Sequence, residues 1–276
     1  MRAFAAVPRE HFLGPGPWKL LLPLRRRAVK RIRKRRSPRT FLDFYRTTPD
    51  SHPRHLYDDV LVGIVPERGL NNGQPSGLAR WFEALELKRG DRLMHVGSGT
   101  GYYSAILAHV VGPKGRIIAV EIDADLAPRA RANLAHLKNV EVAQADGTKY
   151  EPGEVDAIFV NAGANHPCPV WLDSLAPAGR MIFPLVTMQR SRLRGPRGLM
   201  IKVVRRDGTY DASMVSFVGI FPCIGAIDPA EDKLVLDALK RRDYKSIRAL
   251  RRDAHEPDST CWLHSTNFCL STAAAQ

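Results

Sequence analysis

The sequence has few cysteines and no long apolar run, and each absence excludes a class of protein. Its 276 residues include four cysteines and no C-x-x-C pair, so a disulfide scaffold or a structural zinc site is not predicted. No apolar run approaches the roughly 20 residues that a membrane span needs. The first residues, MRAFAAVPREHF, lack the continuous apolar stretch of a secretory signal. A cytoplasmic location is therefore expected.

One pair of residues near the C-terminus has a spacing that metal ligands use. Cys261 and His264 are three positions apart, but a structural zinc site takes four side chains and no second pair is evident. Burial of a small, weakly polar side chain is the simpler explanation for this cysteine. We therefore predict no metal site from the sequence.

Acidic residues are scarce in one segment, and this scarcity explains the net charge of +14. The segment begins at Arg25 and ends at Arg39 (RRRAVKRIRKRRSPR), with ten basic residues and no acid. Without it the net charge falls to about +4, so the excess basicity is local. Such a run can bind nucleic acid or an anionic surface through counterion release. A solvated linker without a partner is the alternative, and the run has no aromatic residue for stacking on bases.

Short apolar runs alternate with helical patterns through the middle of the chain. The expected strands cover residues 92–96, 116–120, 140–142, 155–160 and 180–185. Helices are expected from a cap at Ser76 to Gly90, after Gly101, over 123–136 and over 171–175. This alternation is typical of parallel βαβ units in an α/β domain. Two later runs, 199–204 and 216–221, flank an Asp-Gly turn and are expected to form an antiparallel edge.

A glycine-rich turn follows the first of these strands. Gly97, Gly99 and Gly101 alternate with Ser98 and Thr100. Glycine at alternate positions permits a tight strand-to-helix turn and lets the backbone approach a ligand where a Cβ would clash. The following helix presents free N–H groups, and in a doubly wound sheet ligands bind at this end of the strands.

The spacing of the glycines distinguishes two classes of cofactor. A dinucleotide site prefers G-x-G-x-x-G, and Tyr102 occupies the sixth position, where it would obstruct the pyrophosphate. A site for S-adenosylmethionine (SAM) prefers G-x-G-x-G, which this turn matches. Glu121 ends the second strand, where a carboxylate would bind the ribose hydroxyls. Asp146, followed by Gly147, ends the third strand and could accept a hydrogen bond from the adenine amine. SAM is therefore the predicted cofactor.

Several segments besides the glycine turn resemble the protein-L-isoaspartate O-methyltransferase family. They are AVPREHFLGPGPW (6–18), residues 57–76, LAPAGRMIFPL (175–185) and VGIFPCIG (218–225). The resemblance implies a Rossmann-like, seven-stranded methyltransferase fold: a mostly parallel sheet, helices on both faces and an antiparallel edge. It also implies SAM-dependent esterification of the misplaced carboxylate of isoaspartyl residues in damaged proteins. The basic run and the last fifty residues lie outside the likeness.

The sequence departs from this family at two positions. The family has a serine, thought to contact the substrate carboxylate, where this chain has Gly73 in the segment Asn-Asn-Gly-Gln-Pro. The family has an acid just before the motif glycine, where this chain has His95, which we interpret as a neutral hydrogen-bonding group. Asn161 lies after the fourth strand, where methyltransferases place residues that face the methyl group.

These considerations give two sets of candidate site residues. The candidates for the acceptor side and catalysis are Asn72, Gly73, Gln74 and Asn161. The candidates for cofactor binding are His95, Gly97, Ser98, Gly99, Gly101, Glu121, Ile122, Asp146 and Gly147. A general base is not among them, because a carboxylate acceptor has a pKa near 4 and is already ionised at neutral pH.

The expected organisation has three parts, and two further functions stay open. Residues 1–50 are expected as a helical and basic extension, 51–228 as the methyltransferase domain, and 229–276 as an extension packed on or near the sheet. One alternative is an RNA methyltransferase that uses the basic run, although the chain lacks an N/D-P-P-Y/F motif because Asn161 precedes Ala-Gly-Ala. The other is a SAM-binding protein without transfer activity. The oligomeric state is not predicted.

Overall fold

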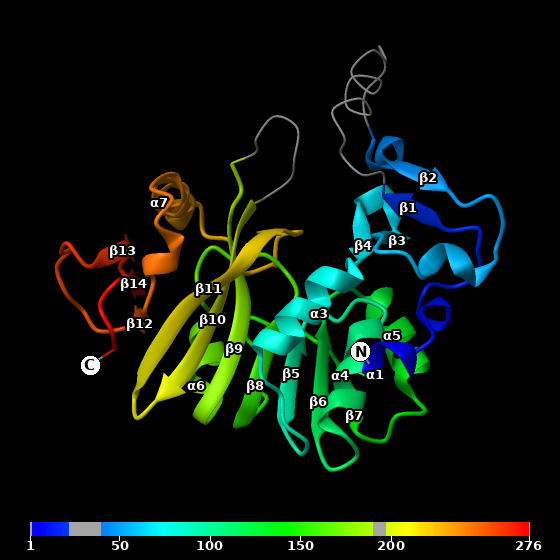
Figure 1. The fold of residues 1–276 in the computed structure, drawn as a ribbon, viewed down its shortest axis with the longest axis horizontal. Helices are drawn as coiled ribbons and strands as arrows, with labels where there is room; N and C mark the ends of the chain where they lie inside the picture. Colours follow the sequence, from blue (N-terminus) through cyan, green and yellow to red (C-terminus); the bar gives the residue numbers. More distant parts are fainter. Residues whose placement is uncertain (1, 22–39, 190–196, 276) are drawn as a thin grey trace.

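The computed structural model describes residues 2–21, 40–189 and 197–275, and Figure 1 shows their path as a ribbon. The basic run from Arg25 to Arg39 lies outside these residues, so its expected partners stay predictions. The described part contains one large sheet, helices on both of its faces, and a smaller sheet near the N-terminus.

Within the described ranges, ten strands form the large sheet. They are β5 (Arg92–Val96), β6 (Arg116–Glu121), β7 (Val140–Gln144), β8 (Val155–Val160), β9 (Leu175–Thr187), β10 (Arg197–Arg206), β11 (Thr209–Gly219), β12 (Ala249–Arg251), β13 (Cys261–His264) and β14 (Cys269–Ser271). Their order is β13-β14-β12-β11-β10-β9-β8-β5-β6-β7. The strands from β5 to β9 pair in parallel, and the others pair antiparallel.

This architecture confirms the predicted Rossmann-like α/β fold. The seven strands β5 to β11 contain the predicted parallel part and the predicted antiparallel edge. The turn between β10 and β11 falls at Asp207 and Gly208, whose φ values of 36° and 90° lie in the left-handed region. A short Asp-Gly turn with positive φ suits a hairpin, because its twist matches that of the two strands.

Helices cover both faces of the large sheet. They are α3 (Pro75–Ala84), α4 (Tyr102–Val111) and α5 (Leu126–Leu134) on one face, and α6 (Pro169–Asp173) and α7 (Pro229–Lys240) on the other. Neighbouring residues of β5 point to opposite faces, so Leu93 packs with the first group and Met94 with the second. None of the helices in the described ranges is long and apolar enough to cross a bilayer.

The N-terminal part forms a second, smaller sheet rather than a helical extension. Its elements are α1 (Arg2–Ala5), η1 (Arg9–Phe12), β1 (Lys19–Leu21), η2 (Phe41–Phe44), β2 (Tyr45–Thr47), η3 (Pro53–Leu56), β3 (Val62–Val65), η4 (Pro66–Arg68) and β4 (Leu70–Asn72). The strand order is β2-β1-β3-β4. The expected boundary after residue 50 therefore runs through this sheet.

The C-terminal residues continue the large sheet. After α7 and η5 (Tyr244–Ser246), β12 pairs with β11, and the hairpin β13–β14 pairs through β14 with β12. Trp262 anchors this part, since its ring is buried and its Nε1 donates to Asp243 Oδ1 at 2.6 Å. The segment 229–276, expected on or near the sheet, thus contributes three strands to it (Figure 1).

A buried ion pair joins α3 to the large sheet. Arg180 of β9 donates from Nη2 to Asp91 Oδ2 at 2.5 Å, and both residues are almost fully buried. The same guanidinium donates to the backbone oxygens of Leu85 and Glu86, each at 3.1 Å. The turn after α3 is therefore held by a guanidinium that is largely shielded from solvent.

Candidate cofactor and acceptor site

The glycine turn connects β5 to α4 and has the backbone conformation that its sequence predicts. Gly97, Gly99 and Gly101 have φ values of 76°, 58° and 91°, all in the left-handed region that favours glycine. A Cβ on Gly101 would also lie 2.6 Å from Leu134 Cδ1 of α5. The close approach of α5 therefore requires glycine at the third position.

Glu121 lies beside this turn because β6 is the parallel neighbour of β5. Its Oε2 accepts a hydrogen bond from Gly99 N at 2.6 Å, and its Oε1 accepts one from Asp123 N at 3.1 Å. Burial raises the pKa of this carboxyl group, and the backbone N–H donors oppose that shift. Ile122 follows it with 40% of its surface exposed, which offers an apolar face next to the carboxylate.

Asp146 follows β7, the third strand in this row. Its Oδ1 accepts hydrogen bonds from the backbone N and the hydroxyl of Thr148, at 2.9 and 2.7 Å. The loop packs over the end of β5, since a Cβ on Gly147 would lie 2.5 Å from Val96 Cγ1. The structure therefore brings the glycine turn, Glu121 and Asp146 to the carboxyl ends of three adjacent parallel strands.

Two hydroxyl groups in the turn are buried without a partner among the described residues. They are Ser98 Oγ and Thr100 Oγ1. A buried polar atom without a hydrogen bond costs about 1–3 kcal/mol. Because Ser98 lies between two glycines of the turn, a polar ligand seated there is one source of the missing hydrogen bond.

His95 precedes the turn, and its ring is fully buried. Its Nδ1 lies 2.8 Å from Ser104 Oγ of α4, and its ring centroid lies 5.1 Å from that of Phe159. Burial lowers the pKa of this imidazole to about 3, which agrees with its interpretation as a neutral group. These contacts of the ring lie in the core beneath α4, so its direct contact with a cofactor stays a prediction.

The burial of His95 predicts that the protein begins to lose stability as soon as the pH falls below about 6.5. In the folded state the ring stays neutral down to about pH 3, whereas an unfolded histidine takes up a proton near pH 6.5. The unfolded state therefore binds more protons between these values, and stability falls with falling pH by about 1.4 kcal/mol per unit. Urea unfolding at pH 7, 6 and 5 should show this loss in the wild type.

The variant His95→Gln isolates this effect, since glutamine can still bond to Ser104 but does not titrate. Its stability should fall less steeply below pH 6.5 than that of the wild type. The exposed His136 gives the matched control, and His136→Gln should keep the wild-type slope. Identical slopes for His95→Gln and the wild type would contradict the prediction.

On the acceptor side, a buried arginine holds the segment that contains Asn72 and Gly73. Arg9 donates from Nε to Asn72 Oδ1 at 2.9 Å and from Nη2 to Gly73 O at 3.0 Å. The same side chain donates to the backbone oxygens of Leu56 and Val60, at 3.0 and 2.9 Å. The Asn72 amide is therefore directed into the protein and positions the backbone of this segment.

Gly73 fits a place where a larger residue would collide. A Cβ at this position would lie 2.7 Å from Leu78 Cδ2 and 3.5 Å from Tyr103 Cε2. The Tyr103 hydroxyl also donates to Gly73 O. The departure from the family serine is thus accommodated by the packing of Leu78 against the segment.

The beginning of α3 differs from the prediction at Ser76. The N-cap position is occupied by Gln74, and Pro75 takes the first helical position, as proline commonly does. Asp59 supplies the missing acceptor: its carboxylate accepts from Ser76 N at 2.9 Å, from Ser76 Oγ at 2.7 Å and from Gln74 Nε2 at 2.6 Å. A residue distant in sequence therefore caps this helix and fixes the Gln74 side chain.

Asn161 is the candidate that lies next to the glycine turn. It directly follows β8, and its backbone N donates to Val96 O at 2.8 Å. Its side-chain Nδ2 lies 3.4 Å from Gly97 O. The predicted cofactor and catalytic sets therefore meet here, at the ends of β5 and β8.

Two residues that contact this site were not predicted from the sequence. Arg9 belongs to the AVPRE segment that carried the family resemblance, but a surface arginine in a loop was equally compatible with the pattern. Ile64 of β3 lies over the turn, since a Cβ on Gly99 would be 3.4 Å from its Cδ1. This contact between the small sheet and the glycine turn could be found only in the tertiary structure.

Comparison with known proteins gives a consistent family. The family model "Protein-L-isoaspartate(D-aspartate) O-methyltransferase" matches residues 42–205. The "Protein-L-isoaspartate O-methyltransferase 2" of Archaeoglobus fulgidus is 39% identical over 142 residues, which cover 50% of this chain and 64% of that protein. A protein-L-isoaspartate O-methyltransferase of Methanoculleus marisnigri is 32% identical over 183 residues, which cover 64% of this chain and 77% of the relative.

Solved structures share the fold. A protein-L-isoaspartate O-methyltransferase aligns with a TM-score of 0.57 and 24% identity, over 74% of this chain and 62% of that one. A putative protein-L-isoaspartate O-methyltransferase from Plasmodium falciparum, solved with S-adenosyl-L-homocysteine, aligns with a TM-score of 0.51 and 21% identity, over 60% of this chain and 81% of that one. Among the sequence relatives, the match to the Archaeoglobus protein spans less than two thirds of that protein's length.

Proposed function

This chain belongs to the protein-L-isoaspartate O-methyltransferase family, and from that premise we propose that it transfers a methyl group from SAM to a protein or peptide carboxylate. The observation that carries the proposal is the convergence of the glycine turn, Glu121 and Asp146 at three adjacent strand ends. The family membership supports a carboxylate of the isoaspartyl type as the acceptor.

The residues at these strand ends suit SAM. The Glu121 carboxylate would accept hydrogen bonds from the two ribose hydroxyls, and Asp146 would accept one from the adenine amine. The exposed side chain of Ile122 would pack against the flat adenine ring. Ser98 Oγ, which is buried without a hydrogen-bond partner among the described residues, would form a hydrogen bond with the cofactor. When bound, the cofactor would supply an activated methyl group.

The protein's own residues have mainly to position the reactants. The acceptor carboxylate is ionised at neutral pH and needs no general base. Correct orientation of two reactants can supply about 7–11 kcal/mol of the barrier. Arg9 and Tyr103 donate hydrogen bonds to Gly73 O and so fix the backbone there, and Ile64 lies against the glycine turn. Asn161, whose Nδ2 lies 3.4 Å from Gly97 O, would contact the acceptor group.

A methylation assay tests the proposed activity. Purified protein would be incubated with labelled SAM and either an isoaspartyl peptide or its aspartyl twin. We expect base-labile methyl incorporation into the isoaspartyl peptide and little into the twin. SAM binding by calorimetry without incorporation into either peptide would refute carboxylate transfer to these acceptors and favour a binding protein without this activity. The cytoplasmic location stays a prediction.

The packing at Gly73 predicts the effect of restoring the family's serine. Gly73→Ser places a Cβ 2.7 Å from Leu78 Cδ2 unless that side chain moves, so we expect a loss of about 1–3 kcal/mol in stability from overpacking. Leu78→Val in the same chain removes one methylene group and should recover part of the loss. Urea unfolding of the two single variants and the double variant measures this coupling. Strictly additive effects of the two substitutions would contradict the steric account.

A further inference from the structure

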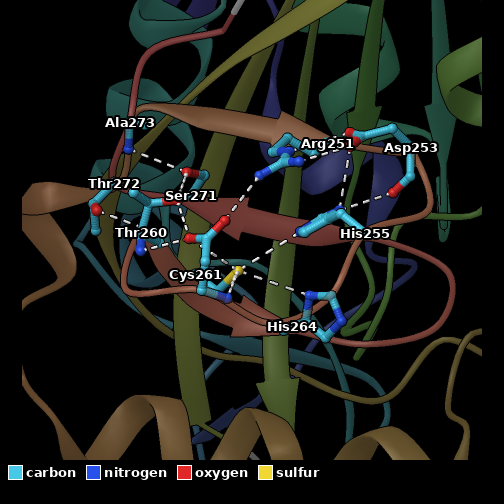
Figure 2. A network of polar contacts seen from close by, with 10 residues as sticks. Arg251, Asp253, His255, Thr260, Cys261, His264, Ser271, Thr272 and Ala273 are labelled. Atoms are coloured by element: carbon cyan, nitrogen blue, oxygen red, sulfur yellow. Dashed lines mark hydrogen bonds and ion pairs between the residues drawn. The ribbon is translucent and has the colours of Figure 1, made fainter.

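A second cluster of reactive side chains lies at the far edge of the large sheet from β7. It contains His255, Cys261, His264 and Cys269, none of which takes part in the proposed methyl transfer. One ligand atom from each of these side chains lies within 4.8 Å of all the others. Figure 2 shows the thiol of Cys261 in contact with the rings of both His255 and His264.

The local fold explains why these four side chains meet. In the hairpin β13–β14, His264 is directly opposite Cys269. Cys261 is three residues from His264, and in a regular strand an odd separation would place the two side chains on opposite faces. A bulge between Cys261 and Leu263 changes this alternation. His255 reaches the same place from the loop that joins β12 to β13.

The distances agree with tetrahedral coordination of one metal ion. Cys261 Sγ lies 3.6 Å from His255 Nε2 and 3.8 Å from His264 Nδ1. Typical bonds of about 2.3 Å from zinc to sulfur and about 2.0–2.1 Å to nitrogen place tetrahedral S and N ligands about 3.6 Å apart. The sulfur and nitrogen atoms therefore already have the separation that a bound ion would impose.

The groups around the cluster orient its ligands. His255 Nδ1 lies 2.9 Å from Asp253 O and 3.3 Å from Asp253 Oδ2, so a proton on Nδ1 leaves Nε2 free for a metal. Metal-binding histidines usually have such an oxygen partner. Arg251 holds the Asp253 carboxylate with Nη2 at 2.7 Å from Oδ2 (Figure 2).

The Cys261 sulfur has its own neighbours. Asp258 N donates to it at 3.4 Å, a contact that also suits a thiolate. The thiol lies 3.7 Å from Asp258 Oδ1, where it can donate when it is protonated. Arg251 Nη1, 3.6 Å from Asp258 Oδ2, offsets the negative charge of that carboxylate.

We propose that His255, Cys261, His264 and Cys269 form a structural zinc site. Two thiolates and two imidazoles are a ligand set that selects zinc, and four protein ligands leave no open position for catalysis. Both thiols would release their protons to solvent on binding the ion. The sequence analysis predicted no metal site because Cys261 and His264 had no evident second pair, and the structure supplies that pair.

The site would link the loop after β12 to β13 and β14, in addition to the pairing of β14 with β12 and with β13. One ligand belongs to the loop after β12, two belong to β13 and one to β14. An ion bound only by the folded chain stabilises it by mass action. We therefore expect zinc to hold the edge of the sheet rather than to take part in methyl transfer.

Metal analysis of the wild-type chain, purified without a histidine tag, is the first test. We expect about one zinc per chain by elemental mass spectrometry, and a lower melting temperature after removal by a chelator. Co²⁺ added to the metal-free protein should give the intense visible bands of tetrahedral cobalt and a thiolate-to-cobalt charge-transfer band. Wild-type protein that holds no zinc and gives no such bands would overturn the proposal, whatever its methyltransferase activity.

Substitutions assign the ligands. Cys261→Ser and Cys269→Ser should each lower zinc affinity at least 100-fold. In the cobalt-loaded protein, each should also reduce the intensity of the thiolate-to-cobalt charge-transfer band by about half. Asp253→Ala should lower zinc affinity about tenfold. Loss of the oxygen partner of a ligating histidine costs about 10–100-fold, and the lower value is expected here because Asp253 O still accepts from His255. Cys168→Ser is the matched control, because this buried cysteine lies outside the cluster.

Two other results would also refute the site. One is a full equivalent of zinc in the chain with both cysteines of the cluster replaced. The other is a disulfide between Cys261 and Cys269 in wild-type protein purified with zinc present, detected by mass spectrometry of peptides. The metal content does not depend on methyl transfer, so failure of this proposal and failure of the proposed function are distinguishable.

Discussion

Glu121→Gln is expected to weaken the binding of SAM about 100-fold. The carboxylate ends β6 beside the glycine turn, with Oε2 2.6 Å from Gly99 N, and in the proposed complex it accepts hydrogen bonds from two ribose hydroxyls. Hydrogen bonds to a charged group contribute about 1.5–3 kcal/mol each. Glutamine keeps the shape and one acceptor but loses the charge, so a loss near 3 kcal/mol follows, which is about 100-fold in Kd.

Calorimetric titration with SAM and with its demethylated product would measure this effect. Glu141→Gln is the control, because Glu141 is an exposed carboxylate on β7 and should leave the Kd unchanged. Thermal unfolding without ligand checks that the variant is folded. A Kd for Glu121→Gln within about twofold of the wild type would exclude the ribose contact.

Arg180→Leu is expected to lower the free energy of unfolding by about 3–5 kcal/mol, because it leaves the buried Asp91 carboxylate without its charged partner. Arg180 Nη2 lies 2.5 Å from Asp91 Oδ2, and the guanidinium also donates hydrogen bonds to the backbone oxygens of Leu85 and Glu86. Leucine can replace neither the charge nor those donors. Urea unfolding at neutral pH would measure the loss.

Two further variants identify the cause of this loss. Arg116→Ala removes an arginine from an exposed ion pair with Glu141 and should cost less than about 1 kcal/mol. The double variant Asp91→Asn, Arg180→Leu should be more stable than Arg180→Leu alone, because it no longer buries an unpaired charge. If the double variant were the less stable of the two, the loss would come from packing or from the backbone oxygens instead.

Local patterns in the sequence were sufficient for the parallel strands of the large sheet and for the glycine turn, whereas β1 to β4 and most of β11 were missed. The run 155–160 matches β8 at both ends, because five of its six residues are apolar, lie between polar turns and are buried by pairing in this sheet. The alternate glycines predicted a turn that only glycine adopts readily, and Gly97, Gly99 and Gly101 all have positive φ. The fold class followed from the alternation of these strands with helices.

Interactions between distant residues could not be predicted in the same way. No pattern in the sequence pairs Asp59 with Ser76, or Arg9 with Asn72, because a side chain's partner across 17 or 63 positions depends on how the chain folds. The same limit applies to the metal cluster. Its ligands follow the spacing H-x₅-C-x₂-H-x₄-C, and Cys261 and His264 share a face only because the strand is bulged.

The sequence alone therefore determined the α/β class and the family, and it predicted a SAM site at the ends of β5, β6 and β7. Each of these depends on periodicity, on glycine's backbone freedom or on short motifs, and these properties are local. The tertiary structure alone decided which polar side chains are buried together. It directs Asn72 toward Arg9 and away from solvent, caps α3 from Asp59, and gathers four thiol and imidazole groups at the far edge of the sheet. These features depend on contacts between strands and loops that only the folded chain brings into reach.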